Sequence, residues 1–399
     1  MRFSLVDNVS FCRYSLFLVA ALAIVFTHAA MPLTDSSVVS LLTVSPGEPL
    51  YSAFGHTGIR VKDSAKGLDV VFNYGTFDDT QDGFYINFVK GKMLYGVTYD
   101  LFPDFMWQYE NYEKRRVVEQ IVHLSLEDRQ KVFDLLAENV KPENAKYYYD
   151  FFWDNCATRP RDVFEKVLVN RLQYNEEVLK NDFTMRQTLH QYVDARPWVA
   201  FGFDLILGLP CEVPATPRNQ TFLPDRLSTL FAYAKVDSTA LVSSTNVLVD
   251  LPEVKIDSSA FTPMVFTFGL FVIGVLIGLW ERFKNTHLWW FDVGVFFVYG
   301  FLGVFFLSLW AFTTHYSVPK NLNVLWLMPT HLVVALLMMR SNKPSWLSIY
   351  MMLTLAAMLL LLLGWKWNPQ PYNVAVIPLL LLIANRALKI IVRLKQTSH

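Results

Sequence analysis

The chain has 399 residues, and its 35 Lys and Arg side chains balance 35 Asp and Glu side chains. A formal net charge of zero excludes an overall electrostatic attraction to nucleic acid, so we predict no nucleic-acid partner. Hydrophobic residues make up 53% of the chain, and they concentrate in its last third. This distribution predicts a domain of ordinary composition followed by a membrane domain.

The first 30 residues predict a secretory signal peptide. Arg2 and Arg13 supply positive charge, residues 14–26 form an apolar stretch, and the small residues Ala29 and Ala30 follow. The alternative is an uncleaved anchor, for which this apolar stretch is short.

Residues 31–234 predict short strands followed by a mixture of helices and loops. Ser125 and Asp128 predict the N-terminal cap of a helix over residues 125–140. Residues 235–260, rich in Ser, Asp and Val, predict a linker. The other expected elements are strands at 37–44, 56–61 and 69–74, a hairpin formed by 86–89 and 94–98, and a helix within 102–116.

Cys156 follows an aromatic block and precedes a predicted helix. The helix is expected to begin near Arg159, with Thr158 as its cap. Backbone N–H groups at a helix start lower the pKa of a thiol and can bind an oxyanion. We therefore predict that Cys156 is a nucleophile with a lowered pKa, and that Asn155 and Arg159 contact the substrate.

A thiol nucleophile requires a base, and His56 is the expected one. His56 heads the strand 56–61, so its ring can project from the edge of a sheet. Asn73, on the next strand, is expected to orient the imidazole. The alternatives are structural: an ordinary histidine in a sheet, and turn chemistry for Asn73 before Gly75.

Two further readings concern the other cysteine and metals. Cys156 and Cys211 are the two cysteines expected outside the membrane, and such a pair is commonly a disulfide in an oxidising compartment. That alternative, a disulfide between Cys156 and Cys211, stays open.

His56, His123 and His190 are scattered without ligand spacing, so we predict no metal site and no cofactor.

Five apolar stretches at the end of the chain predict membrane-spanning helices, because each has about the length that a ~30 Å hydrocarbon core requires. Lys and Arg gather after the first and third stretches and at the C-terminus, so residues 31–260 are expected outside the cytoplasm. The stretches are 261–280, 288–312, 322–339, 346–365 and 372–392.

A polar cluster lies in the outer loop between the second and third stretches. His315, Asn321 and Asn323 are on the same side of the membrane as Cys156. We predict that they form part of the floor of the site and contact a lipid headgroup or glycerol. The alternative is a hydrated loop that only connects two spans.

Several motifs resemble the Lnb N-terminal periplasmic domain family: FGHTGIRV at 54–61, NYGTFD at 73–78 and DFFWDNCATRPRD at 150–162. The later segments FGFDLILGLPCE and TFLPDRL resemble it as well. The order strand-His, strand-polar, helix-Cys also resembles the circularly permuted branch of the papain-like fold, which includes lecithin–retinol acyltransferase. The expected fold class is therefore an α+β papain-like periplasmic domain followed by an all-α transmembrane bundle of about five helices.

The resemblance implies an enzyme of lipoprotein biosynthesis, because the family includes bacterial lipoprotein N-acyltransferases. It implies His56 and Cys156 as the reacting pair and leaves the third residue open. The implied reaction moves an acyl chain from a phospholipid, through a Cys156 thioester, to the N-terminal amine of a diacylated lipoprotein. The implied location is the bacterial inner membrane, crossed several times, with the catalytic domain in the periplasm.

The predicted boundaries are a signal peptide at 1–30, a periplasmic thiol-enzyme domain at 31–234, a linker at 235–260 and a transmembrane domain at 261–399. Two alternatives to the acyltransferase remain. One is a cell-envelope cysteine peptidase or amidase, which would share the fold and the reacting pair. The other is a non-enzymatic membrane module in which Cys156 and Cys211 form a disulfide.

Overall fold

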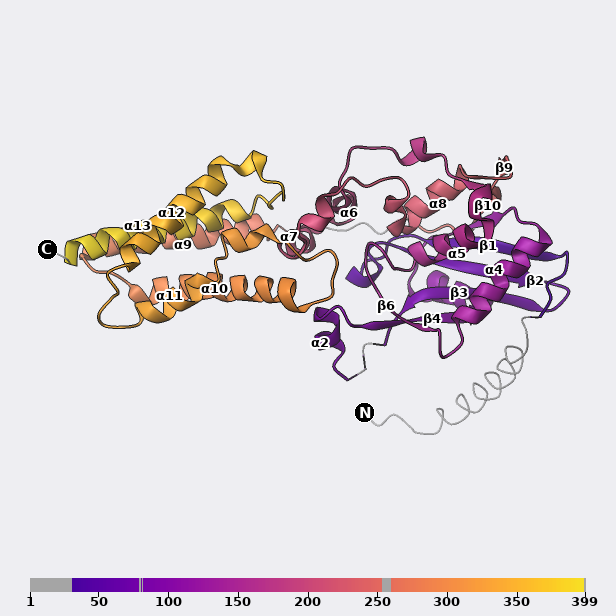
Figure 1. The fold of residues 1–399 in the computed structure, drawn as a ribbon, viewed down its shortest axis with the longest axis horizontal. Helices are drawn as coiled ribbons and strands as arrows, with labels where there is room; N and C mark the ends of the chain where they lie inside the picture. The colour runs from indigo at the N-terminus through magenta and orange to yellow at the C-terminus, as the bar shows by residue number, and fades with distance from the viewer. Residues whose placement is uncertain (1–30, 79, 81, 253–259, 398–399) are drawn as a thin grey trace. The chain divides into compact units, whose positions relative to one another are not determined.

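The computed structural model describes residues 31–78, 80, 82–252 and 260–397 (Figure 1). The predicted signal peptide, with Cys12, lies outside the described residues. The described chain divides into two compact units, which we call the sheet unit and the helical unit. The sheet unit comprises residues up to 78, Leu94–Lys180 and residues from Pro217 to 252, and the helical unit comprises Thr80–Met93, Asn181–Thr216 and residues from 260 onward.

The sheet unit is built on a seven-stranded antiparallel sheet in the order β10-β5-β1-β2-β3-β4-β6. Its strands are rich in β-branched and aromatic residues, which pack well on a pleated surface. The strands are β1 (Ser37–Val44), β2 (His56–Asp63), β3 (Leu68–Thr76), β4 (Leu94–Leu101), β5 (Val117–Val122), β6 (Lys146–Tyr148) and β10 (Val242–Val249).

Helices cover both faces of this sheet. On one face, α4 (Leu126–Asn139), α5 (Thr158–Leu168) and α8 (Pro224–Ala232) share a buried apolar core with the strands. On the other face, α3 (Phe102–Trp107) and the π-helical η2 (Gln108–Tyr112) bury Phe105 and Tyr109 against the sheet. Since neighbouring strand residues face opposite ways, Asn73 shares the α3 face with Val71, whereas Phe72 and Tyr74 enter the core below α4 and α5.

The capped helix predicted at 125–140 is confirmed as α4, since the Ser125 side chain accepts a hydrogen bond from the Asp128 N–H. Short elements complete the sheet unit. They are η1 (Leu50–Ser52), η3 (Val169–Arg171), β7 (Leu172–Gln173), η4 (Glu176–Leu179), η6 (Asn219–Phe222), β8 (Lys235–Val236) and β9 (Thr239–Ala240).

Three local predictions differ from the structure. Residues 86–89, expected as half of a hairpin, belong to the helix α2 (Phe84–Val89). The expected linker at 235–260 contains the sheet strand β10, which pairs with β5. As an outer strand, β10 exposes most of its residues and therefore has the Ser-rich composition of a linker. The helix after Cys156 begins at Thr158, one residue earlier than expected.

The helical unit contains five apolar helices that follow the predicted spans in order (Figure 1). Of the described helices, α9 and α10 are long and apolar enough to cross a membrane by length and composition. The third predicted span is divided into η7 (Leu322–Leu325) and α11, because Pro329 cannot continue the hydrogen-bonding of a helix interior. The helices are α9 (Pro263–Lys284), α10 (Trp289–Phe312), α11 (Thr330–Met338), α12 (Leu347–Leu363) and α13 (Val376–Thr397).

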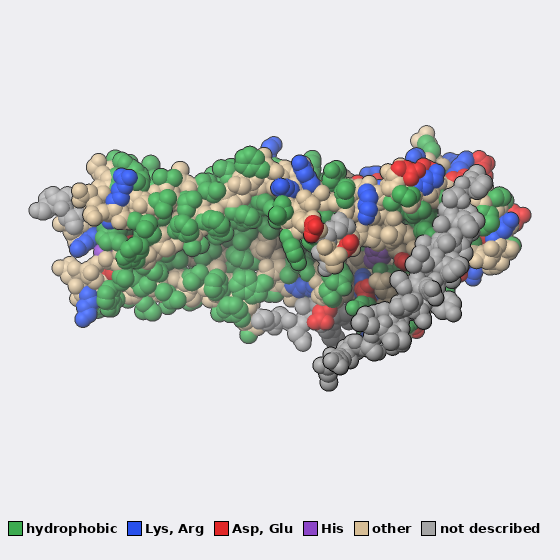
Figure 2. Space-filling view, turned by 90° about the horizontal axis from the view of Figure 1, so that it is seen from below, with side chains coloured by type: hydrophobic (Ala, Val, Ile, Leu, Met, Phe, Trp, Pro, Cys, Tyr) green, Lys and Arg blue, Asp and Glu red, His purple; other side chains and the backbone are tan. Residues whose placement is uncertain are grey.

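Hydrophobic side chains gather over these helices, and Lys and Arg lie at the end that carries the C-terminus (Figure 2). The helical unit also includes two segments that precede the last third of the chain. Residues 80–93 and 181–216 cluster with the helices, although the sequence predicts them within a continuous domain at 31–234. These elements are α2, α6 (Met185–Val193), α7 (Pro197–Ile206) and η5 (Leu209–Glu212), and η8 (Trp365–Trp367) follows α12.

Candidate active site

Cys156 lies in a tight loop that the Asn155 side chain holds in shape. The Asn155 Oδ1 accepts hydrogen bonds from the N–H groups of Ala157 (2.8 Å) and Thr158 (2.9 Å). The N-cap of α5 is Ala157 rather than the predicted Thr158, and the Asn155 side chain binds the N–H groups at this helix start. Its Nδ2 donates to the carbonyls of Phe151 (2.7 Å) and Phe222 (2.8 Å). These contacts position Cys156 at the start of α5, and contact between Asn155 and a substrate stays a prediction.

The loop brings Cys156 against the ends of β2 and β3. Gly75, with φ +83°, packs on it so closely that an added Cβ would lie 3.4 Å from the Cys156 Cβ. The backbone N–H groups of Thr57 and of Cys156 itself donate toward the Cys156 thiol. Since Thr57 follows His56 directly, the fold brings the predicted nucleophile to the strand that carries the predicted base.

His56 forms the contact with Asn73 that the sequence predicts. The His56 Nε2 lies 3.0 Å from the Asn73 Oδ1, and the Asn73 Nδ2 donates to the Asp100 Oδ2 at 2.8 Å. Because Asn73 gives its amide N–H to a carboxylate, it offers its oxygen to the imidazole. The neutral ring then carries its proton on Nε2 and keeps Nδ1 as the basic nitrogen.

Asp100 is a residue that the sequence analysis missed. On β4, Thr98 pairs with Asn73, and Asp100 lies two residues further along on the same face. Such diagonal neighbours are within reach of each other, but only the register of β3 against β4 reveals them.

A second group that the sequence analysis missed surrounds His56. The Tyr109 ring stacks on the imidazole with centroids 6.3 Å apart, and the Arg115 guanidinium carbon lies 5.3 Å from the centre of the Tyr109 ring. Arg115 is buried, donates to the Ser45 carbonyl (2.6 Å) and pairs with Glu113 (2.6 Å). Among the described residues, its second terminal nitrogen is buried without a hydrogen-bond partner.

Burial keeps both reacting groups neutral. Burial lowers the pKa of His56 to about 4, although the hydrogen bond to Asn73 acts in the opposite direction. Burial also raises the pKa of Cys156 to about 11, against the N–H groups and the positive charge of Arg115. The predicted lowering of the thiol pKa is therefore wrong, because the cost of burying a thiolate exceeds the effect of the nearby N–H groups.

Comparison with protein families identifies both halves of the chain. The family model of the Lnb N-terminal periplasmic domain matches residues 27–192, and that of the Lnb transmembrane domain matches residues 255–397. The chain belongs to the Lnb family. It is thus a membrane protein with a periplasmic part, and its family indicates a lipoprotein-modifying enzyme. No curated protein and no solved structure matches the chain. The papain-like fold and the number of membrane crossings stay predictions.

Arg159, which the sequence predicts to contact the substrate, is held by its neighbours. Its Nη2 donates to the Asp154 Oδ2 at 2.8 Å, and its guanidinium carbon lies 3.5 Å from the centre of the Tyr147 ring. Arg159 and Asp154 also line a pocket of about 340 Å³ together with Tyr74 and Trp153. Its contact with substrate stays a prediction, and any such ligand would compete with Asp154.

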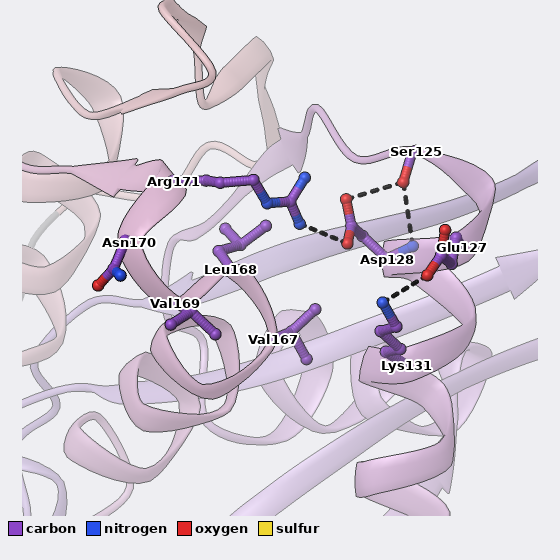
Figure 3. Close-up of a pocket in the computed structure, with 9 residues that line it drawn as sticks. All are labelled: Ser125, Glu127, Asp128, Lys131, Val167, Leu168, Val169, Asn170 and Arg171. Atoms are coloured by element: carbon purple, nitrogen blue, oxygen red, sulfur yellow. Dashed lines mark hydrogen bonds and ion pairs between the residues drawn. The ribbon is translucent and has the colours of Figure 1, made fainter.

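Another pocket, of about 380 Å³, lies between the start of α4 and the end of α5 (Figure 3). Its charged groups already pair with each other: Arg171 with Asp128 at 2.6 Å, and Lys131 with Glu127 at 2.6 Å. Cys156 and His56 line neither pocket, so we assign no chemistry to this one.

The three polar residues predicted at the floor of the site belong to the helical unit. Asn321 and Asn323 are buried, and their amides donate to carbonyls at the end of α7, including that of Leu205 (2.6 and 3.1 Å). The His315 Nε2 lies 2.9 Å from the Phe88 carbonyl. The two asparagines therefore tie α7 to the helices, and a role of all three in substrate binding stays a prediction.

The second cysteine and the acidic groups point to no further chemistry. Cys156 and Cys211 are not joined by a disulfide in the described chain, and the Cys211 thiol donates to the Ser317 carbonyl at 3.5 Å.

Glu281, His287 and Asp292 have the spacing of metal ligands. However, Arg386 already forms ion pairs with both carboxylates (2.9 and 2.6 Å), so we assign no metal to this cluster.

The contact between Asn73 and Asp100 leads to a first prediction. Replacing Asp100→Asn removes a charged acceptor, whose hydrogen bond is worth about 1.5–3 kcal/mol. We expect acyl loading of Cys156, measured by intact-protein mass spectrometry, to slow roughly tenfold to a hundredfold. The matched control is Asp134→Asn, an exposed carboxylate in α4, which should change little. Equal rates in the two variants would mean that Asp100 does not position the pair.

Proposed function

We propose that the chain is an apolipoprotein N-acyltransferase that uses Cys156 as its nucleophile. The observation that carries the proposal is the set His56, Asn73 and Asp100, linked by hydrogen bonds of 3.0 and 2.8 Å on the strand pair against which Cys156 packs. Lnb family membership and the membrane domain support a substrate that resides in a membrane. The proposed substrates are a phospholipid acyl donor and a diacylated lipoprotein acceptor.

In the first proposed step, the Cys156 sulfur attacks an ester carbonyl of the phospholipid while its proton passes to His56 Nδ1. A neutral thiol and a neutral imidazole suit this concerted transfer, because neither charge must be held in a buried site beforehand. The tetrahedral intermediate then collapses. The carbon–oxygen bond breaks, the leaving lysophospholipid takes the proton from His56, and a thioester remains.

In the second step, the free amine of the lipoprotein's N-terminal cysteine attacks the thioester carbonyl. His56 accepts a proton from the amine, the carbon–sulfur bond breaks, and the Cys156 sulfur recovers a proton. The product is an amide. A membrane domain in the same chain keeps the enzyme where both lipid substrates reside, which is a proximity advantage.

Arg115 is the group that we expect to stabilise negative charge in these steps. Its buried positive charge acts on the Cys156 thiol, and one of its terminal nitrogens is without a hydrogen-bond partner in the described structure. The variant Arg115→Gln removes that charge. We expect roughly 10²-fold slower thioester formation, the scale of losing one oxyanion donor.

The matched control is Arg116→Gln, the next residue, which is partly exposed and pairs with Asp250 at 3.5 Å. It should react at the normal rate. Thermal unfolding of both variants checks that neither has lost its fold. If Arg115→Gln is folded and loads at the normal rate, Arg115 has no part in charge stabilisation.

The function itself is tested on lipoproteins in cells. Mass spectrometry of lipoprotein N-termini, with and without this protein, should show a third acyl chain only when it is present. Diacylated lipoproteins in both cases would refute the acyltransferase. In that event a peptidase or amidase becomes the better proposal, and hydrolysis of cell-wall peptides by the purified protein would test it.

A further inference from the structure

The segment between β3 and β4 belongs to the helical unit rather than to the sheet. Residues Thr80–Met93 cluster with the helices, although β3 and β4 pair directly with each other. The segment contains the six-residue helix α2 (Phe84–Val89). A simple connection between two paired antiparallel strands needs only a few residues, so the additional length calls for another explanation.

Backbone contacts hold this segment to the residues just beyond the end of α10. The Thr314 N–H donates to the Lys90 carbonyl at 3.0 Å, and the Thr314 hydroxyl donates to the Gly91 carbonyl at 2.8 Å. The His315 Nε2 lies 2.9 Å from the Phe88 carbonyl. Since α10 ends at Phe312, these contacts fix α2 at the end of a helix that has the length and hydropathy of a membrane span.

The close fit at Gly91 shows that the sequence favours this contact between the α2 segment and the residues after α10. Gly91 has φ +68°, and an added Cβ would lie 2.9 Å from both the His315 backbone nitrogen and the Thr314 hydroxyl. Any other residue would be strained and would push the two segments apart.

Most side chains of α2 are apolar and exposed. Tyr85 is 77% exposed, Ile86 61% and Phe88 52%, and every residue of the helix is at least partly exposed. Packing against a protein core therefore cannot account for these residues. Lys90 and Lys92 follow at once, and long cationic side chains at the edge of an apolar surface suit the headgroup region of a membrane.

We propose that α2 is an interfacial helix whose exposed apolar side chains lie among the headgroups and upper acyl chains of the outer leaflet. Its attachment to the end of α10 argues for lipid rather than a protein partner, because that span end lies at the same boundary. Phe312, the last residue of α10, is 80% exposed, so both of the segments that meet here carry exposed apolar side chains.

The placement of α2 in the membrane interface has a consequence for the acyl-transfer reaction, and this consequence rests on the proposed function. The chain runs from Asn73 on β3 through the α2 segment to Asp100 on β4. The loop that joins the two strands orienting His56 would then be embedded in the lipid that supplies the acyl chain. We infer that α2 recruits the phospholipid donor by contact with its acyl chains and glycerol.

The test measures the depth of α2 in a bilayer and needs no turnover. The full-length protein, with Cys12→Ser, Cys156→Ser and Cys211→Ser, carries a single environment-sensitive fluorophore on Ile86→Cys in vesicles of phosphatidylethanolamine and phosphatidylglycerol. A control fluorophore is placed on Lys66→Cys, in the exposed turn after β2. We expect the Ile86 label to lose most of its fluorescence to shallow doxyl lipids and little to aqueous iodide, and the Lys66 label to show the reverse.

Two outcomes would overturn the proposal. Quenching of the Ile86 label by iodide alone would place α2 in water, and shielding from both quenchers would mean that protein covers it.

The donor role is tested separately with the double variant Ile86→Ser/Phe88→Ser in a chain that keeps all of its cysteines. Acyl loading of Cys156 from vesicles should fall at least severalfold while its alkylation by iodoacetamide is unchanged. Unchanged loading would refute the donor role, whereas absence of loading in the unmodified protein would refute the proposed function instead.

Discussion

The variant Cys156→Ser is expected to form no acyl-enzyme and to lose lipoprotein acylation by roughly 10⁴-fold or more. A hydroxyl is a much weaker nucleophile than a thiol at neutral pH, and His56 cannot offset that difference. The fold should survive, because the serine hydroxyl can accept the same N–H groups of Thr57 and residue 156 that face the thiol. Intact-protein mass spectrometry after incubation with phospholipid vesicles measures the adduct directly.

The matched control for this prediction is Cys211→Ser. Cys211 is buried, and its thiol donates to the Ser317 carbonyl, a contact that a hydroxyl also makes. We expect normal acyl loading and normal thermal stability in this variant. A comparable loss of activity at both cysteines would contradict the assignment of Cys156 as the nucleophile and would return attention to a disulfide.

The second large effect is expected for His56→Ala. Loss of general acid–base catalysis typically costs ~10²–10⁴ in rate. The exposed His123, which follows β5 in the same unit, provides the matched control His123→Ala and should change little. If both histidine variants load Cys156 at the normal rate, the proton must leave the thiol by another route.

The same histidine predicts how the protein responds to acid. The unfolded chain protonates His56 near its ordinary pKa of 6.5, whereas the folded site takes a proton only at about 4. Falling pH therefore favours the unfolded state between these two values, and the stability contributed by neutral His56 is lost across that window. We expect acyl loading to persist to about pH 5, and His56→Ala to lose less thermal stability than the unmodified protein on acidification from pH 6.5 to 4.

Local patterns in the sequence determined much of this protein. The apolar runs with their flanking Lys and Arg predict the membrane half, and the model of the Lnb transmembrane domain confirms that half. Ser125 and Asp128 predict the start of α4, and His56 and Asn73 on neighbouring strands predict a contact that forms at 3.0 Å. These features could be predicted because each depends on residues a few positions apart or on adjacent strands.

Only the tertiary structure decided the features that depend on contacts between segments far apart in the sequence. Asp100 reaches Asn73 only through the register of β4 on β3, and Arg115 reaches the site only because α3 and η2 fold over that face. The raised pKa of Cys156 follows from burial, which many segments create together. The assignment of residues 80–93 and 181–216 to the helical unit depends on contacts across more than a hundred residues. A cut at residue 260 would separate these segments from the helices on which they pack, because compact units form by contact in space rather than by position along the chain.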